Sequence, residues 1–171
     1  MGGSIQLPYV LFVCVENACR SQIAEAFARQ YGQDRIKAYS AGSRPRGQVD
    51  AQATAVMKER GLDLSLQASK GLWDLPQVTW DAIVTMGCGD ACQTLPAKQR
   101  LDWRIPDPAR QPLEIYRQVR ETIAASVKTL VEHLTTEAGT PPTAGSPKAG
   151  HPRVRHSAST PMVDAPGVPE P

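Results

Sequence analysis

The sequence of 171 residues lacks any apolar run close to the roughly 20 residues that a membrane-spanning helix needs. Its first residues, 1–6, contain neither the charged segment nor the apolar segment that begins a secretory signal. Gln6 also stands where N-myristoylation requires Ser or Thr. We therefore expect a cytoplasmic protein that binds no membrane.

A strong charge of either sign is also missing. Lys and Arg number 19 and Asp and Glu number 17, which gives a formal net charge of +2. This balance excludes the strongly basic surface of a nucleic-acid-binding protein, but it suits a small anion as substrate.

Histidine is scarce, with three residues in the chain. His133 falls near the end of a predicted helix, and His151 and His156 lie in the last part of the sequence. None of them can be matched with a Cys, or with a Ser and an Asp, in a catalytic arrangement. The sequence therefore offers no histidine-based mechanism.

The four cysteines form two close pairs, Cys14 with Cys19 and Cys88 with Cys92. In a cytoplasmic protein such cysteines are more often catalytic, redox-active or metal-binding than joined in permanent disulfides. Neither pair has the two-residue spacing of a zinc knuckle, and Arg20 beside the first pair would repel a dication. A zinc-binding protein is an alternative, although we expect no bound metal.

The most informative stretch is a short apolar run, residues 9–13, that ends in Cys14 and is followed six positions later by Arg20. The run is rich in β-branched and aromatic residues, which predicts a buried parallel strand. The next segment has its large apolar residues on one helical face: Ile23, Phe27 and Tyr31. The loop between strand and helix therefore offers free N–H groups that can hold a tetrahedral oxyanion. Together with the Arg20 guanidinium they would favour the nucleophilic thiolate form of Cys14.

Further strands are predicted over residues 35–40 and 80–86, with a brief extended piece at 102–105. Helices are predicted over 51–60 and 113–134. Strands that alternate with helices predict an α/β fold of three layers, in which helices flank an open parallel sheet.

The composition divides the chain into three parts. Residues 1–8 lead into one α/β catalytic domain of ordinary size, which we place at 9–134. From residue 135 to 171 the sequence consists largely of Pro, Gly, Ala, Ser and Thr without periodicity. We expect this segment to be a disordered tail.

The pattern of Cys14, five residues, Arg20 and Ser21 resembles the phosphate-binding loop of the low-molecular-weight protein tyrosine phosphatase fold. Gln22 makes the loop more similar to that of the arsenate reductases on this fold, since the phosphatases more often have proline there. The resemblance covers residues 9–134. It implies a low-molecular-weight phosphatase-like fold and an oxidoreductase that converts arsenate to arsenite.

The resemblance also implies roles for individual residues. Cys14 attacks the arsenic of arsenate, Arg20 holds the oxygens, and Asp107 protonates the departing oxygen. Ser21 hydrogen-bonds the thiolate, and Asn17 stabilises the unusual backbone of the loop. The implied oxyanion-binding set is Val15, Glu16, Asn17, Ala18, Cys19 and Arg20.

Reduction of arsenic by two electrons requires a second thiol, whereas a phosphatase requires only water. Cys92 matches the later of two cysteines that thioredoxin-coupled arsenate reductases keep in this loop. Cys88 has no clean match, because Gly87 stands at the position of the earlier cysteine. The segment 87–92 is more similar to relatives that use mycothiol or glutathione with a glutaredoxin-like partner. The resemblance thus implies an external thiol reductant, with Cys92 and Cys88 as candidate resolving residues.

Two departures from the family pattern carry expectations. Arg110 stands where glycine usually follows Asp-Pro-Ala, so this loop should be stiffer or more basic. Some of the reductases bind a monovalent cation beneath the loop. Asn17, Glu25 and Ser40 fit that site, but Lys70 stands where an acid is expected. We expect the ammonium group of Lys70 to replace the cation.

A hydrolase is the alternative function. As a low-molecular-weight protein tyrosine phosphatase, the chain would use Cys14, Arg20 and Asp107 to hydrolyse phosphate monoesters through a phosphocysteine, with Cys88 and Cys92 as bystanders. As a reductase it would serve arsenic resistance. In either case we expect a monomer or weak dimer that binds arsenate or a phosphate-like oxyanion.

Overall fold

The apolar run that ends in Cys14 forms an inner strand of a four-stranded parallel sheet in this computed structural model. The order of the strands is β2-β1-β3-β4. Their bounds are β1 (Tyr9–Cys14), β2 (Lys37–Gly42), β3 (Trp80–Thr85) and β4 (Ala97–Asp102). All three pairings are parallel, so the expected open parallel sheet is confirmed.

The structure describes residues 4–89 and 93–138. These residues belong to a unit that spans 1–141, and a second unit, 142–171, lies outside the described residues.

The carboxyl ends of the parallel strands meet at one edge of the sheet. Cys14 lies opposite Gly42, and Val13 lies opposite Thr85. The N–H group of Met86 donates to the carbonyl of Val13 at 2.8 Å, so the loops after β1 and β3 begin side by side. Ligands of open parallel sheets bind at this edge.

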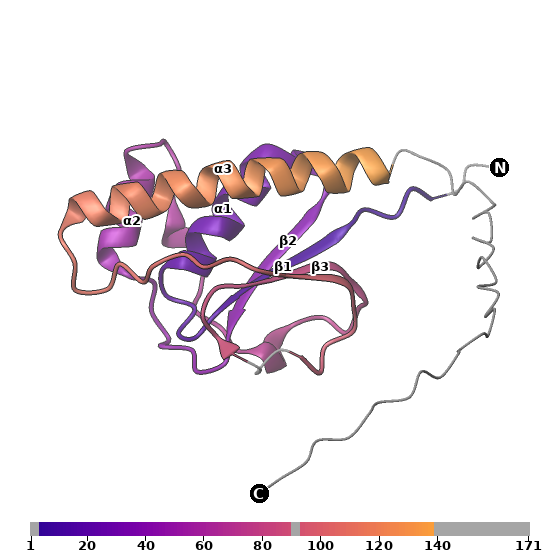
Figure 1. Cartoon of the computed structure of the whole chain (residues 1–171), viewed down its shortest axis with the longest axis horizontal. Coiled ribbons are helices and arrows are strands. Elements are labelled where there is room, and N and C mark those ends of the chain that lie inside the picture. The colour runs from indigo at the N-terminus through magenta and orange to yellow at the C-terminus, as the bar shows by residue number, and fades with distance from the viewer. Residues whose placement is uncertain (1–3, 90–92, 139–171) are drawn as a thin grey trace, which may run out of the picture. The chain divides into compact units, whose positions relative to one another are not determined.

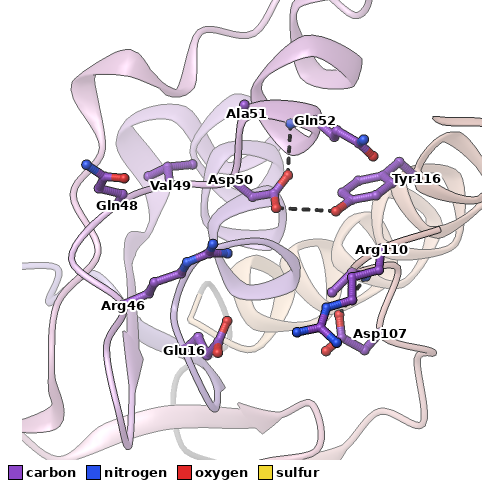
Figure 2. Close-up of a pocket in the computed structure, with 11 residues that line it drawn as sticks. Glu16, Arg46, Gln48, Val49, Asp50, Ala51, Gln52, Asp107, Arg110 and Tyr116 are labelled. Atoms are coloured by element: carbon purple, nitrogen blue, oxygen red, sulfur yellow. Dashed lines mark hydrogen bonds between the residues drawn. The ribbon is translucent and has the colours of Figure 1, made fainter. Parts of the chain in front are cut away.

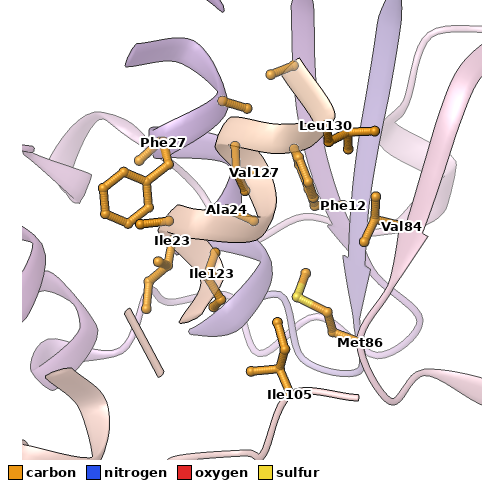
Figure 3. Close-up of a cluster of buried hydrophobic side chains, with 14 of the residues drawn as sticks. Phe12, Ile23, Ala24, Phe27, Val84, Met86, Ile105, Ile123, Val127 and Leu130 are labelled. Atoms are coloured by element: carbon orange, nitrogen blue, oxygen red, sulfur yellow. The ribbon is translucent and has the colours of Figure 1, made fainter. Parts of the chain in front are cut away.

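Two helices cover one face of the sheet, and a third packs beside them (Figure 1). They are α1 (Arg20–Gly32), α3 (Leu113–Glu137) and α2 (Ala51–Lys58). Their apolar stripes bury a core that Figure 3 shows between helices and strands. It contains Phe12, Ile23, Phe27, Val84, Ile123 and Val127. Of the helices in the described part of the chain, none has the length and apolar character needed to cross a membrane.

The opposite face of the sheet holds a second apolar cluster. Leu11, Val13 and Ile83 point into it from the inner strands. The short 3₁₀ helix η3 (Leu72–Asp74) and Leu75 in the loop that follows pack against these side chains. Helical and loop segments thus flank the sheet on both faces, as a low-molecular-weight phosphatase-like fold requires.

The fourth strand does not lie where the sequence predicted it. The sequence indicated an extended piece at 102–105, whereas β4 spans Ala97–Asp102. This strand lies at the sheet edge and alternates between half-buried and exposed residues, so it includes Lys98, Gln99 and Arg100. A strand that buries so little has no apolar run by which to recognise it.

The last helix is longer than predicted. It continues to Glu137, and the hydroxyl groups of Thr135 and Thr136 bond to carbonyls of the preceding turn, Val131 and Glu132. The disordered tail remains a prediction, because residues 139–171 lie outside the described part.

Candidate functional site

The loop between β1 and α1, residues 15–19, is held from its outer side by the segment 44–50. Three of its carbonyls accept backbone hydrogen bonds from this segment. The pairs are Arg44 to Val15 at 2.9 Å, Arg46 to Glu16 at 2.9 Å and Asp50 to Ala18 at 2.8 Å. Val15, Glu16, Ala18 and Cys19 of this loop line the hollow above Cys14. No side chain caps that first turn, so it can receive an anion.

Gly42, at the end of β2, permits the close approach of this loop. A Cβ atom on Gly42 would lie 2.6 Å from the carbonyl oxygen of Val15 and 2.8 Å from the nitrogen of Asn17. Asn17 itself has φ 47°, a left-handed conformation that Asn tolerates better than most residues.

A chain of hydrogen bonds supports Cys14, which is 4% exposed. Its Sγ lies 2.9 Å from Ser21 Oγ, and Asn17 Nδ2 donates to the same Ser21 oxygen at 2.8 Å. Because Ser21 accepts there, its own proton is free to point at the sulfur and stabilise a thiolate. Asn17 Oδ1 accepts from the N–H of Lys70 at 2.8 Å and from Gln22 Nε2 at 2.9 Å, which fixes the amide orientation.

Gln22 is fully buried and ties the loop to the segment 67–70. Its Nε2 also donates to the carbonyl of Ala68 at 3.0 Å, and its Oε1 accepts from Gln67 Nε2 at 2.7 Å. A proline at this position could form none of these bonds.

Arg20 lines the same hollow and is largely buried. Its Nη1 donates to the carbonyl of Ile105 at 2.9 Å, and its Nη2 lies 3.6 Å from Asp107 Oδ2. The side chain of Asp107 is 58% exposed, and the N–H of Ala109 donates to its Oδ1 at 3.1 Å. Gly87 leaves room for the guanidinium, since a Cβ there would lie 3.3 Å from Arg20 Nη1. The structure therefore brings the predicted cation and acid together beside Cys14.

Cys19 differs from Cys14 in its electrostatics. Burial raises the pKa of the Cys19 thiol far above its ordinary value, and the negative charge of Asp50 raises it further. Cys19 therefore stays a neutral thiol on the wall of the hollow.

The hollow above Cys14 has a volume of about 40 Å³ and opens beside a larger pocket of about 790 Å³. Figure 2 shows the side chains that line the larger pocket, with Arg46 and Arg110 on different loops. Five residues belong to both cavities: Glu16, Arg46, Asp50, Asp107 and Ala109. A molecule in the pocket thus has access to a group held over Cys14.

Of the second predicted cysteine pair, the structure describes Cys88 but not Cys92. Cys88 is 9% exposed and packs with Leu11, Val13 and Ile83 on the face of the sheet opposite α1. It is not among the residues that line the hollow. Cys92 lies outside the described residues, so its predicted role stays a prediction. Within residues 4–89 and 93–138, no group of three or more His, Cys, Asp or Glu side chains could hold a metal ion.

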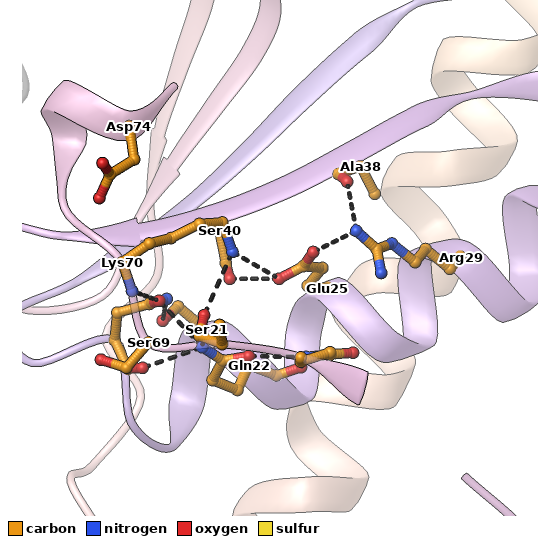
Figure 4. A network of polar contacts seen from close by, with 12 residues as sticks. Ser21, Gln22, Glu25, Arg29, Ala38, Ser40, Ser69, Lys70 and Asp74 are labelled. Carbon is orange, nitrogen blue, oxygen red and sulfur yellow. Dashed lines mark hydrogen bonds and ion pairs between the residues drawn. The ribbon is translucent and has the colours of Figure 1, made fainter. Parts of the chain in front are cut away.

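Lys70 occupies the place beneath the loop where we expected its ammonium group. Figure 4 shows the buried Glu25 carboxylate between Lys70, Ser40 and Arg29. Lys70 Nζ lies 3.5 Å from Glu25 Oε2, and Ser40 Oγ donates to the same oxygen. Arg29 forms an ion pair with the other carboxylate oxygen. Two cationic side chains therefore compensate the buried charge of Glu25.

The sequence analysis missed the walls of the larger pocket, Arg46, Asp50 and Tyr116 among them. Asp50 Oδ1 accepts from the N–H groups of Gln52 and Ala53 at the start of α2, and its Oδ2 accepts from the Tyr116 hydroxyl at 3.3 Å. Burial and the nearby Asp50 charge raise the pKa of Tyr116, so it remains a donor. Nothing in the sequence shows that the segment 44–50 packs against the loop after β1.

Comparison with known proteins agrees with this geometry. Residues 9–139 match the family model described as low molecular weight phosphotyrosine protein phosphatase. An arsenate reductase of Halalkalibacterium halodurans is 35% identical over 133 residues, which cover 72% of this chain and 94% of the relative. A glutaredoxin arsenate reductase of Synechocystis sp. is 35% identical over 125 residues, 71% of this chain and 95% of the relative.

Solved structures give the same result. An arsenate reductase in a phosphate-binding state superposes with a TM-score of 0.67 at 32% identity, over 75% of this chain and 99% of the other. A thioredoxin-dependent arsenate reductase of Corynebacterium glutamicum superposes with a TM-score of 0.66 at 30% identity, over 79% of this chain and 65% of the other. The chain therefore belongs to the low molecular weight phosphotyrosine protein phosphatase family, and within it to the arsenate reductases.

Proposed function

We propose that this enzyme reduces arsenate to arsenite through a covalent adduct on Cys14, which a second thiol resolves. The observation that supports it most directly is the arrangement around Cys14. Ser21 lies 2.9 Å from the sulfur, and Arg20 and Asp107 line the hollow. A thiolate, an anion clamp and an acid are the three groups that the first step requires.

In the first step the Cys14 thiolate attacks arsenic and one arsenate oxygen leaves. Arg20 and the loop N–H groups hold the remaining oxygens, because their charge must be stabilised throughout the transfer. Asp107, more exposed than Arg20 and directed at it, is placed to give a proton to the departing oxygen, which leaves as water.

In the second step a thiolate attacks the Cys14 sulfur. A disulfide forms, the sulfur–arsenic bond breaks, and its electron pair passes to arsenic, which leaves as arsenite. Cys88 packs within the apolar cluster and not on the hollow, which favours Cys92 or an external thiol for this attack. The relatives include glutaredoxin- and thioredoxin-dependent enzymes, so we propose a thiol–disulfide reductant as the partner.

We also propose that the enzyme works in the cytoplasm as part of arsenic resistance. Cys14 and Cys19 are free thiols, and the cytoplasm keeps thiols reduced.

Single-turnover chemistry tests this function. Reduced protein is mixed with arsenate, alone or with dithiothreitol or glutathione, and arsenite is counted, with Cys14→Ser treated in the same way. We expect arsenite from the wild type once a competent thiol is present, and none from Cys14→Ser. If arsenite forms without an external thiol, Cys92→Ser and Cys88→Ser would show which cysteine resolves the adduct. No arsenite with any thiol would contradict the proposal.

Phosphate-ester hydrolysis is the second candidate function. The family model is that of a phosphatase, and a phosphorylated Cys14 beside Asp107 would need only water to react further. Release of nitrophenol from p-nitrophenyl phosphate by the wild type, lost in Cys14→Ser and without arsenite formation from arsenate, would establish it instead.

A further inference from the structure

Three charged side chains of the larger pocket are not neutralised by any residue that the structure describes. Arg46, Arg110 and Glu16 line this pocket (Figure 2). In the part of the chain that the structure describes, none of the three side chains forms a hydrogen bond or an ion pair. The other charged pair at the rim behaves differently, since Arg20 and Asp107 face each other at 3.6 Å. The pocket thus offers two free guanidinium groups and one free carboxylate.

The backbone of Arg110 supports a role for its side chain. Its φ is 64°, in the left-handed region, where glycine is favoured and a long side chain is strained. Strain of this kind is typically found at functional sites, where the surrounding structure holds the residue in place. The strained backbone of Arg110 therefore lies at the same pocket that its side chain lines.

We propose that this pocket binds a peptide-sized thiol with two carboxylates and one ammonium group, the charge pattern of glutathione, and that this thiol resolves the Cys14 adduct. The inference rests on the proposed function and names its second thiol. Arg46 and Arg110 would pair with the two carboxylates, and Glu16 would pair with the ammonium group. A volume of about 790 Å³ is ample for a tripeptide.

The shared wall between the two cavities gives the bound thiol access to Cys14. Arg46 and Asp107 border both the pocket and the hollow, so a ligand held by Arg46 lies next to the adduct. Its thiolate attacks the Cys14 sulfur, the sulfur–arsenic bond breaks, and arsenic leaves as arsenite with the electron pair. The product on the enzyme is a mixed disulfide between Cys14 and the peptide thiol. A glutaredoxin-like dithiol then reduces this mixed disulfide by supplying two electron equivalents, which frees the Cys14 and peptide thiols and leaves the dithiol oxidised to a disulfide.

The same charges argue against the other candidate thiols. An uncharged sugar thiol such as mycothiol would leave both guanidinium groups and the Glu16 carboxylate without partners in the pocket. A thioredoxin would present a folded surface, whereas these charges line a concavity. A charged small thiol satisfies all three groups at once.

Binding is tested without turnover by titrating S-methylglutathione, which cannot react, into the wild-type enzyme by calorimetry. We expect saturable one-to-one binding, weakened about tenfold in Arg110→Gln and in Arg46→Gln by the loss of one charge-assisted pair. Arg35→Gln is the matched control and should bind the ligand as the wild type does. Arg35 does not line the pocket, and its guanidinium donates to the carbonyl of Tyr31. Absence of binding, or equal binding by all variants, would overturn the proposal.

Turnover then tests the use of the bound thiol. The ratio of kcat/KM for glutathione to that for its diethyl ester compares the same thiol with and without carboxylate charge. We expect a ratio well above one for the wild type and for Arg35→Gln, and a value about tenfold lower for Arg110→Gln. A wild-type ratio near one would overturn the proposal, as would full single-turnover arsenite formation without external thiol. Arsenite formation with dithiothreitol in either case would leave the reductase function standing, so the two failures can be told apart.

Discussion

The Nδ2 group of Asn17 donates to Ser21 Oγ at 2.8 Å, and this bond decides where the Ser21 proton points. A hydroxyl that accepts from an amide can donate its own proton only elsewhere, and Cys14 Sγ lies 2.9 Å away. Asn17 is in turn fixed by the backbone of Lys70. The Asn17 bond thus leaves the Ser21 proton available to the Cys14 sulfur.

Ser21→Ala should slow formation of the arsenate adduct about tenfold, because one hydrogen bond to a charged group is lost. The measurement is the rate of Cys14 alkylation by iodoacetamide together with single-turnover arsenite formation. Ser65→Ala, at an exposed position in the 3₁₀ helix η2 (Leu64–Leu66), serves as the control and should match the wild type. Equal rates for all three proteins would show that Ser21 does not stabilise the thiolate.

Wild-type stability and activity should be insensitive to potassium, because the Lys70 ammonium lies 3.5 Å from the buried Glu25 carboxylate. Lys70→Ala removes that charge and opens a site between Glu25 and Ser40. We expect potassium chloride to raise the Tm of this variant by about 4 °C, which corresponds to about 1 kcal/mol for a domain of this size.

Choline chloride at the same ionic strength is the control for this experiment, since its cation is too large for the site and only screens charge. A potassium-dependent Tm or rate in the wild type would contradict the assignment of Lys70 as the resident cation.

An ion-pair network joins α3 to Glu59 at the end of α2 and should make stability depend on pH in the acid range. Arg117 and Arg120 donate hydrogen bonds to Glu59, which lowers its pKa from the ordinary 4.5 to about 2. Since the pKa of the folded state is the lower one, the contribution to stability is present above pH 4.5 and is lost as the pH falls through about 2. Glu59→Gln should therefore lower the Tm at neutral pH. The difference in Tm between this variant and the wild type should shrink as the pH falls from 4.5 to about 2.

The comparison for Glu59→Gln is Glu132→Gln on α3, the helix that carries Arg117 and Arg120. The Glu132 carboxylate forms no ion pair with another described residue. The Tm of Glu132→Gln should differ from that of the wild type by a constant amount from neutral pH to pH 2. If Glu59→Gln behaves in the same way, the network does not control acid stability.

The sequence was sufficient to predict the parts of the fold that depend on burial. The run of residues 9–13 and the apolar stripe of 113–134 predicted the inner strand and the longest helix, because both bury large side chains. The edge strand β4 was misplaced because it buries almost nothing. Hydropathy patterns indicate which residues are buried. An edge strand is held mainly by backbone hydrogen bonds to its neighbour, and hydropathy does not indicate these bonds.

The sequence likewise predicted some residues of the candidate site and not others. Cys14, Arg20 and Ser21 are contiguous in the sequence, so their grouping was predictable from spacing. Arg46 and Tyr116 reach the larger pocket from segments far apart in the chain, and only the folded structure brings them together. Arg110 was singled out by sequence as unusual, but its left-handed backbone and free guanidinium became apparent only in the structure.

Arg110→Gly should raise stability while it weakens use of a charged thiol. Glycine adopts φ 64° without steric strain, so we expect a gain of about 1 kcal/mol in the free energy of unfolding, measured in urea. Arg110→Ala is the control, because alanine also lacks the guanidinium but keeps the strained backbone, and it should show no such gain. Equal stability of the two variants would show that residue 110 is not strained.

Gly42→Ala should disrupt the oxyanion site from outside it. The added Cβ would lie 2.6 Å from the carbonyl of Val15 and 2.8 Å from the nitrogen of Asn17, so either the loop or β2 must move. Such overpacking typically destabilises by about 1–3 kcal/mol, and we expect it to weaken phosphate binding, measured by calorimetry, more than tenfold.

Gly61→Ala is the matched control, since its Cβ would meet nothing within 4 Å and its φ of 72° strains only the local backbone, remote from the loop. It should lower stability but bind phosphate as the wild type does. If Gly42→Ala also keeps full affinity, the close contact between β2 and the loop does not hold the oxyanion site in shape.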